Sequence, residues 1–397
     1  MKSTDVTRPL SFALVLVVMG PLVCGCPQTP PEDLDAYIEY LMQESHIPGL
    51  AAVVFTESEI VWAKGYGWAN IEEEVPVTPE TLFQLASISK TVTGTAVMQL
   101  VEAGSLDLDA DIGDYLPFAI RHPQFPDTPI TSRMVLTHTS GLRDNSRVYN
   151  KLYEYGADSP IGLSELIEGF FTPEGQWYDS KRNFTSSAPG EEFQYSNLGF
   201  ALLGLLVEEV AKQPFDAYCN ERIFEPLALD ETSWLLRDLT ADHIAMPYRD
   251  VSLLGQARYT PYGQYGYPDY PSGQIRTSVT QFARFYQAIM RGGELEGTRI
   301  LEEDTVALML TAQLAEETAE QCLGWIRLTE GDPAPLNGHG GGEQGVLTMA
   351  WFDPETSTGV MVFTNGDAAD LLQRRVRKRV EAITAIQNRL FNEAGTL

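Results

Sequence analysis

The sequence predicts an α/β (α+β) protein in which an antiparallel sheet, flanked by helices, is built from both ends of the chain. Short apolar runs typical of strands occur near residue 50 and again beyond residue 320. The middle of the chain instead has helical patterns broken by loops rich in Pro, Gly and Tyr. We therefore expect residues 33–105 and 271–397 to form a sheet-containing α/β subdomain, with residues 106–270 inserted as a helical subdomain with loops.

The folded part begins with a predicted helix over residues 33–44 and a predicted hairpin. Apolar residues 50–55 and 60–68 flank the polar residues 56–59, which is typical of two antiparallel strands joined by a turn. A long helix follows from about Ser87. Its apolar positions recur every four residues and a glycine supplies the stop (Ile88, Val92, Ala96, Leu100 and Gly104).

The last third of the chain contains three predicted strands and a helix. Residues 323–328, 346–352 and 359–364 are short apolar runs, and residues 353–358 join the last two. A charged helix is expected from about Ala368 to the end. These strands are the second contribution to the sheet.

The first residues have the pattern of an export signal. Lys2 and Arg8 precede an apolar run over residues 10–19, which is too short for a membrane span of about 20 residues. Gly25 and Cys26 then resemble a bacterial lipobox. We expect a signal peptide over residues 1–25, lipidation of Cys26 as the mature N-terminus, and a Pro-rich tether over residues 26–32. An ordinary secretory signal cleaved nearby is the alternative.

Composition argues against a nucleic-acid partner and against a cysteine metal site. The chain has 397 residues, 44% of them hydrophobic, which is enough for a sizeable core. Its net charge of −28 argues against a nucleic-acid partner held by phosphate contacts. Cys219 and Cys322 remain after the leader and could pair in an oxidising compartment, but their spacing does not decide this. No cysteine pattern indicates a metal site. We also expect no cofactor, and we expect a monomer.

Ser87 and Lys90 form the chain's one Ser-x-x-Lys tetrapeptide. Three residues are nearly one helical turn, so Lys90 lies beside Ser87 on the same face. A serine hydroxyl is a weak nucleophile until a base removes its proton, and a lysine of lowered pKa can serve. The alternative is that Ser87 caps the helix and Lys90 is solvated.

Two further segments favour the catalytic interpretation. Tyr195-Ser196-Asn197 precedes an apolar helix, so Asn197 can cap that helix while the Tyr195 phenol relays a proton. The segment 338–342, Gly-His-Gly-Gly-Gly, directly precedes a predicted strand. Its glycines allow a ligand to approach the backbone closely.

Together these three motifs resemble the serine β-lactamase and penicillin-binding protein superfamily, whose motifs are Ser-x-x-Lys, Tyr-x-Asn and Lys-Thr-Gly on a strand. Residues 83–90, 106–112, 136–142 and 223–232 extend the resemblance. The chain is most similar to the branch that contains class C β-lactamases, D-Ala-D-Ala carboxypeptidases, D-aminopeptidases and carboxylesterases. The resemblance implies the β-lactamase/transpeptidase-like fold.

The resemblance also implies the role of each residue. Ser87 is the acylated nucleophile, Lys90 its general base, and Tyr195 the group that protonates the leaving atom. Asn197 would hydrogen-bond the substrate's acyl-side amide. His339-Gly340-Gly341 corresponds to Lys-Thr-Gly, and the backbone N–H groups of Ser87 and Gly342 would form the oxyanion hole.

His339 is a departure from the family pattern, because it replaces the lysine that usually meets a substrate carboxylate with a group largely neutral at pH 7. This puts efficient β-lactam hydrolysis in doubt; alternatively, His339 is merely packed at a strand start. The Tyr-rich residues 259–270 either line the cleft or lie in surface loops.

The sequence therefore predicts an exported, membrane-anchored serine hydrolase that acts on an amide or ester as a β-lactamase-related peptidase or esterase. The expected partner is a small-molecule or peptide substrate, which could be a cell-wall peptide. A true D-Ala-D-Ala carboxypeptidase or β-lactamase is one alternative. A catalytically silent, penicillin-binding-like surface lipoprotein is the other.

Overall fold

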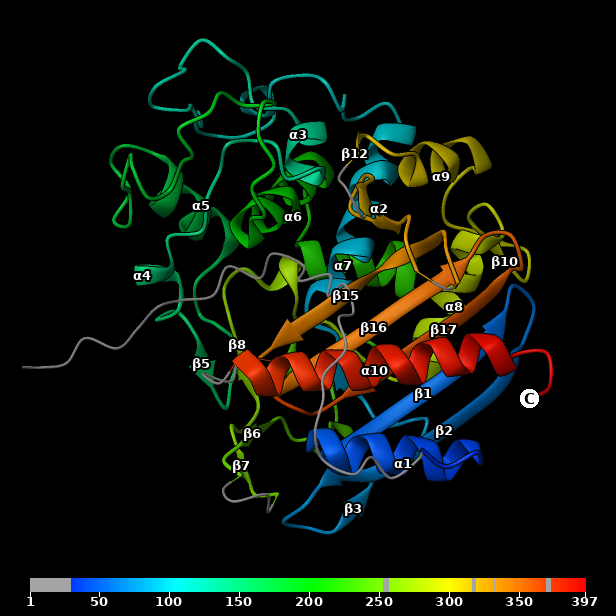
Figure 1. Cartoon of the computed structure of the whole chain (residues 1–397). Helices are drawn as coiled ribbons and strands as arrows, with labels where there is room; N and C mark the ends of the chain where they lie inside the picture. The colour runs from blue at the N-terminus through cyan, green and yellow to red at the C-terminus, as the bar shows by residue number, and fades with distance from the viewer. Residues whose placement is uncertain (1–29, 253–256, 316–318, 332, 369–372) are drawn as a thin grey trace, which may run out of the picture.

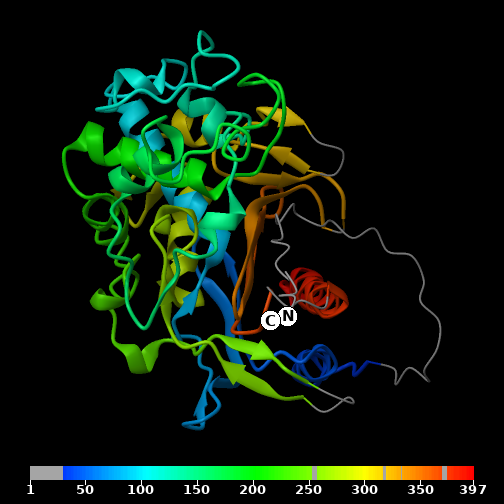
Figure 2. The same cartoon turned by 90° about the vertical axis from the view of Figure 1, so that its left-hand side faces the viewer.

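The protein has a helix layer, a large sheet, and a second, thicker helical layer (Figures 1 and 2). Figure 1 looks through α10 onto the sheet, and the side view in Figure 2 separates the layers. The computed structural model describes residues 30–252, 257–315, 319–331, 333–368 and 373–397.

The sheet joins the two ends of the chain, as predicted. In the described residues it has nine strands in the order β12-β13-β14-β15-β16-β17-β1-β2-β3, all paired antiparallel. The N-terminal hairpin meets the C-terminal strands through β1 and β17, from Leu50 opposite Thr364 to Thr56 opposite Thr358. The strands are β1 (Gly49–Thr56), β2 (Ile60–Asn70), β3 (Val75–Pro76), β12 (Leu314–Ala315), β13 (Ala319–Gln321), β14 (Ile326–Leu328), β15 (Leu336–Glu343), β16 (Val346–Asp353) and β17 (Thr358–Thr364).

Side-chain alternation in β1 explains why both faces of the sheet are covered. Leu50, Ala52 and Val54 pack with α1 (Leu34–Ser45) and α10 (Gln373–Glu393). The residues between them, Ala51, Val53 and Phe55, belong to the larger core on the opposite face. That face contacts α8 (Val279–Met290). A strand buried on both faces is apolar throughout, which is why residues 50–55 form a continuous apolar run.

Two buried helices form the centre of the larger core. α2 (Ser89–Glu102) and α6 (Asn197–Ala211) pack against each other, and residues 198–207 of α6 are all buried. A helix that is apolar all round is typical of such a central position. Around these two lie α3 (Ser132–Leu136), α4 (Ser146–Tyr149), α5 (Leu163–Phe171), α7 (Phe215–Cys219) and α9 (Glu303–Leu310).

Four short strand pairs lie outside the main sheet. They are β4 (Phe83–Gln84) with β9 (Arg276–Thr277), β5 (Glu154–Tyr155) with β8 (Tyr265–Gly266), β6 (Tyr248–Asp250) with β7 (Tyr259–Pro261), and β10 (Glu294–Leu295) with β11 (Thr298–Arg299). The pair β4–β9 lies next to the candidate site, because β4 leads into the turn that carries Ser87.

The structure confirms the predicted fold class and the N-terminal hairpin, and it corrects three details. The glycine-rich segment 338–342 lies within strand β15, although the sequence places it before a strand. Glycine is needed at position 338, because a Cβ there would lie 2.1 Å from the carbonyl oxygen of Ala350. The strand predicted over residues 323–328 is shorter in the structure, where β14 covers only Ile326–Leu328. The helix predicted from Ser87 is divided into a short turn and α2.

The described residues also answer two smaller questions. Cys219 and Cys322 are both buried free thiols, so the disulfide that the sequence left open is not formed. Within these residues, no helix is long and apolar enough to cross a membrane. The predicted signal peptide and Cys26 lie outside the described residues, and the bounds of the two subdomains remain a prediction.

Candidate active site

A tight turn presents Ser87 to solvent. The turn η1 (Ala86–Ile88) links β4 to α2, and Ala86 adopts a left-handed backbone with φ of 48°. The amide of Leu85 donates to Ile275 O at 2.8 Å, and the carbonyl of Leu85 accepts from Thr348 Oγ1 at 2.7 Å. Ser87 is partly exposed while the residues on either side of it are buried. The strained turn is therefore held from both sides, with Ser87 partly exposed.

Lys90 is fully buried one helical turn after Ser87 and contacts it directly. Its Nζ lies 3.1 Å from Ser87 Oγ, 2.8 Å from Asn197 Oδ1 and 2.7 Å from Ser272 O. Burial lowers the pKa of Lys90 to about 7, although the charges of Asp269, Asp144 and Glu343 partly oppose this. Lys90 is thus available as a neutral amine near pH 7.

The contacts of Lys90 match the needs of a general base. A neutral amine has two hydrogens and one lone pair. The oxygens of Asn197 and Ser272 can only accept, so they take the two hydrogens. The lone pair is then directed at the Ser87 hydroxyl, ready to remove its proton.

Tyr195 contacts the same serine oxygen from the other side. Its hydroxyl donates to Ser87 Oγ at 2.8 Å, and burial raises the pKa of the phenol above its ordinary value. The ring lies 5.0 Å from Lys90 Nζ, a cation–π distance when Lys90 is charged. Tyr195 is therefore a protonated donor at neutral pH, placed beside the nucleophile.

The start of α6 positions Tyr195 and Asn197. The structure corrects one prediction here: Ser196, not Asn197, caps the helix, through its Oγ and the amide of Gly199 at 3.0 Å. Asp144 supports the same turn, accepting from Ser196 Oγ, Asn197 N and Leu198 N at 2.7, 2.8 and 3.1 Å. Asn197 is therefore the first residue of the helix, with its side chain free to turn toward Lys90.

Asn197 has a second polar group available for a ligand. Its Oδ1 is held by Lys90, and within the described part of the chain its Nδ2 has no partner. The residue is partly exposed. An amide nitrogen in this position can donate to a carbonyl oxygen of a bound substrate.

His138 is packed behind Tyr195 and has a structural role. Its ring lies 4.2 Å from the ring of Tyr195 and 5.2 Å from that of Phe200, and its Nδ1 accepts from Ser196 N at 3.2 Å. Burial holds the pKa of His138 well below its ordinary value. It is a neutral spacer that supports the Tyr195 turn.

Strand β15 runs directly past the nucleophile turn. A Cβ on Gly341 would lie 2.3 Å from Leu85 O, 2.4 Å from Thr348 Oγ1 and 3.1 Å from Ala86 Cβ. Only glycine allows this approach without displacing the backbone. Beyond Gly338, where pairing with β14 ends, β15 is paired in the described sheet with β16 alone. Gly342, the next residue, therefore lies on a part of β15 that has a strand partner in the described sheet on one side only.

His339 lies on β15 as a buried, neutral side chain. Its Nδ1 is 2.5 Å from the carbonyl oxygen of Gly340, so Nδ1 carries the hydrogen. Burial and the nearby charge of Lys90 lower the pKa of His339 to about 3, despite that carbonyl. The site therefore lacks the permanent cation that the family motif places there.

Sequence reasoning missed three contributors to the site. Asp144 is an isolated acid in a loop, with no motif to mark it. Ser272 acts through its carbonyl, and its side chain donates to the buried carboxylate of Asp269 at 2.8 Å. Burial raises the pKa of Asp269 to about 6. No motif in the sequence indicates that the Ser272 carbonyl accepts from Lys90.

Only part of the Tyr-rich segment reaches this region. Tyr265 and Tyr267 are buried, with rings 5.7 and 5.3 Å from that of Tyr153. Tyr270 instead packs against Phe215 and Trp234 in the core. Tyr265, Tyr267 and Tyr270 are therefore packed in the interior and do not lie in surface loops, and their place in a substrate cleft stays a prediction.

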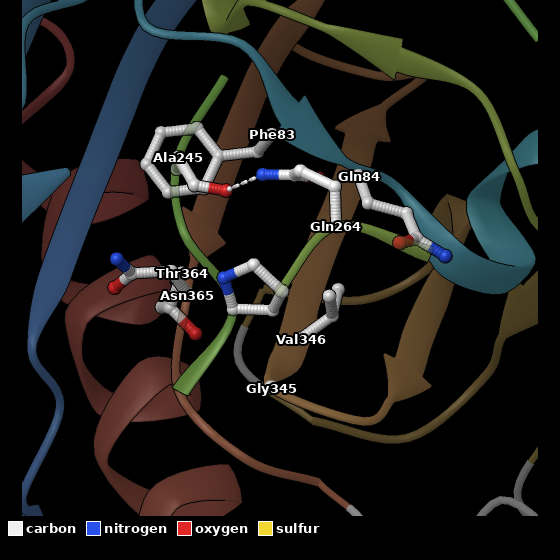
Figure 3. Close-up of a pocket in the computed structure, with 9 residues that line it drawn as sticks. Phe83, Gln84, Ala245, Gln264, Gly345, Val346, Thr364 and Asn365 are labelled. Carbon is white, nitrogen blue, oxygen red and sulfur yellow. Dashed lines mark hydrogen bonds between the residues drawn. The ribbon is translucent and has the colours of Figure 1, made fainter. Parts of the chain in front are cut away.

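A separate small pocket lies beside the active site (Figure 3). Its hollow measures about 210 Å³ when the space open to solvent is included, and Gln264 Nε2 donates to Ala245 O at 3.0 Å between two of its lining residues. Ser87 is not among the residues that line it: Phe83, Gln84, Ala245, Pro247, Gln264, Gly345, Val346, Thr364 and Asn365. In the described ranges, no group of three His, Cys, Asp or Glu side chains could hold a metal ion.

Two curated proteins show what this chain resembles in sequence. Protein flp of Staphylococcus aureus (strain MRSA252) is 26% identical over 248 residues, which are 62% of this chain and 46% of that protein. The chain thus spans about half the length of the first curated relatives. Penicillin-binding protein 4 of Amycolatopsis lactamdurans is 27% identical over 348 residues, covering 83% of this chain and 84% of that one.

Solved structures show the same fold. The octameric penicillin-binding protein homologue from Pyrococcus abyssi has a TM-score of 0.70 at 24% identity, covering 90% of this chain and 78% of that chain. The D-amino acid amidase from Ochrobactrum anthropi, complexed with L-phenylalanine amide, has a TM-score of 0.67 at 21% identity, covering 89% and 99%. The model of the Beta-lactamase family matches residues 34–383. The chain therefore belongs to the Beta-lactamase family, within the serine β-lactamase and penicillin-binding protein superfamily.

Proposed function

We propose that the protein is an exported serine hydrolase that forms an acyl-enzyme on Ser87 and hydrolyses an amide or an ester. One observation carries the proposal: Lys90 Nζ and the Tyr195 hydroxyl both lie within hydrogen-bonding distance of Ser87 Oγ, at 3.1 and 2.8 Å. One group can accept the serine proton while the other can donate a proton, and both are needed for acyl transfer.

Acylation uses these two groups in sequence. Ser87 Oγ attacks the substrate carbonyl carbon while its proton passes to Lys90. The resulting oxyanion is stabilised by the backbone N–H groups of Ser87 and Gly342, and Asn197 Nδ2 orients the acyl-side amide. Tyr195 gives its proton to the departing nitrogen or oxygen as the carbonyl–leaving-group bond breaks. The proton held by Lys90 then restores the Tyr195 phenol.

Deacylation repeats the chemistry with water as the nucleophile. Water attacks the acyl carbon and loses a proton to the Lys90–Tyr195 pair, and Ser87 Oγ leaves with a proton from the same pair. The products are a carboxylic acid and the free serine. Every step uses side chains and backbone groups of this chain.

Peptidase or esterase activity is favoured over β-lactam hydrolysis. A β-lactam bears a carboxylate, and the neutral, buried His339 offers no cation to it. The similarity to the D-amino acid amidase is consistent with an amide substrate, although it shows only a shared fold. A D-Ala-D-Ala carboxypeptidase or β-lactamase is the second candidate, favoured by the similarity to penicillin-binding protein 4.

Export and anchoring are proposed on the sequence pattern alone. Lys2, Arg8 and the apolar run before Cys26 support a signal peptide followed by a lipid anchor on that cysteine. The anchored domain would face the periplasm or the cell exterior as a monomer.

Hydrolysis by matched variants tests the proposal. Wild type and Ser87→Ala would be assayed with p-nitrophenyl esters, p-nitroanilides and penicillin. Ser105→Ala, an exposed serine in the loop after α2, is the control. We expect ester or amide turnover in wild type and Ser105→Ala, and none in Ser87→Ala at an unchanged melting temperature. Turnover that survives in Ser87→Ala would show that the nucleophile is misassigned, and a folded wild type inactive on all substrates would favour a silent binding protein.

A further inference from the structure

Strand β15 carries a carboxylic acid on the face that is turned toward the Ser87 turn. Side chains of a strand alternate between its faces, so His339, Gly341 and Glu343 lie on one face. Gly341 contacts Leu85 and Ala86, which shows that this face is turned toward the nucleophile. Glu343 lies two residues further along, roughly 7 Å from Gly341, and is the residue directly after Gly342.

Glu343 is held in place by neutral groups. Its Oε2 accepts from the Tyr153 hydroxyl at 2.8 Å, and its Oε1 accepts from Gln344 N at 2.9 Å. Tyr153 in turn packs against Tyr265 and Tyr267. The carboxylate therefore has an ordered orientation and two further lone-pair positions, and it is partly exposed.

No cation of the described chain neutralises Glu343. It forms no ion pair there, and Lys90, whose charge acts on Glu343, makes its own hydrogen bonds to Ser87, Asn197 and Ser272. Burial raises the pKa of Glu343 to about 7, so a positive group beside it would favour the ionised carboxylate. With the uncharged His339 two residues before Gly341, the face of β15 that is turned toward Ser87 carries an acid and no cation. A cation on the ligand could form an ion pair with the Glu343 carboxylate.

We infer that Glu343 is a specificity-determining residue that binds a primary ammonium group of the substrate, close to the oxyanion hole. This inference rests on the proposed function and names the substrate class: amides or esters with a free amine near the scissile carbonyl. The Tyr153 hydroxyl positions the carboxylate, and Tyr265 and Tyr267 form an apolar support behind it. Substrates with a carboxylate at the same place are disfavoured by repulsion.

Binding measurements separate this inference from the question of turnover. In a Ser87→Ala background, isothermal titration calorimetry would compare phenylalaninamide, in both enantiomers, with its N-acetyl forms. We expect at least one free-amine enantiomer to bind roughly tenfold more tightly than its neutral counterpart, as for a charge-assisted hydrogen bond. Because no hydrolysis is required, a failure of the catalytic proposal leaves this readout intact.

Glu343→Gln in the same background should abolish the preference, because glutamine retains the shape and loses the charge. Glu355→Gln is the matched control, an exposed acid in the turn between β16 and β17 that should keep the full preference. Glu343→Ala replaces the glutamine variant if that one does not fold. The inference is overturned if the parent binds both forms equally, or if the preference survives the loss of the Glu343 charge.

Discussion

Gly341→Ala should inactivate the enzyme by separating β15 from the nucleophile turn. The new Cβ would lie 2.3 Å from Leu85 O, whereas Cβ atoms essentially never approach other atoms within 3.0 Å. The strand or the turn must therefore move by about 0.7 Å or more, because the obstacle is backbone. A displacement of this order between Ser87 and Gly342 misaligns the oxyanion hole, and we expect kcat/KM to fall by roughly 100-fold.

Gly340→Ala is the matched control for this change. It adds the same methyl group one residue away on the opposite face of β15, where the nearest atom, Thr348 O, is 3.8 Å from the new Cβ. Hydrolysis of a p-nitrophenyl ester and a thermal melt would be measured for both variants. We expect Gly340→Ala to retain activity within a fewfold. Equal activity of the two variants would refute the idea that close approach at Gly341 builds the site.

Three other predictions test individual groups. For a neutral ester, kcat/KM should rise about tenfold per pH unit below pH 7 and level off above it. The reason is that Lys90, with its pKa lowered to about 7, acts as a base only when it is neutral. A pH-independent rate would argue against Lys90 as the base. His339→Lys should increase the relative kcat/KM for carboxylate-bearing substrates. It should also move the rise of kcat/KM with pH to lower pH, since a second cation lowers the pKa of Lys90 further. An unchanged pH profile and substrate preference would contradict the role of residue 339 in charge recognition. Asp144→Ala should lower both kcat and the melting temperature, because it leaves three donors at the start of α6 without their acceptor. Each donor that stays buried costs about 1–3 kcal/mol of folding free energy. Wild-type values of kcat and melting temperature would show that Asp144 does not position Tyr195.

Local sequence spacing identified candidate groups for the site, and the family resemblance supplied their expected roles. Ser87 and Lys90 are one helical turn apart, and Tyr195 directly precedes an apolar helix, so their relation is encoded over a few residues. Their convergence on one oxygen atom came from the family resemblance, since 108 residues separate Ser87 from Tyr195.

The parts that were missed depend on distant contacts or on the absence of side chains. Asp144 supports α6 from a loop 53 residues away from Asn197, and Ser272 contributes only a carbonyl. Strand β15 is hidden in the sequence because glycine has low strand propensity, although glycine is required where β15 passes Leu85. Glu343 has no motif of its own, and its position beside Tyr153 is visible only in three dimensions.

Covalent labelling tests the identity of the nucleophile most directly. The purified domain would be treated with a fluorophosphonate, weighed intact by mass spectrometry, and digested to locate the adduct, with Ser87→Ala treated in parallel. We predict one adduct per chain, located on Ser87 and absent from Ser87→Ala. An unlabelled wild type, or an adduct on another residue, would contradict the assignment of Ser87 as a nucleophile activated by Lys90 and Tyr195.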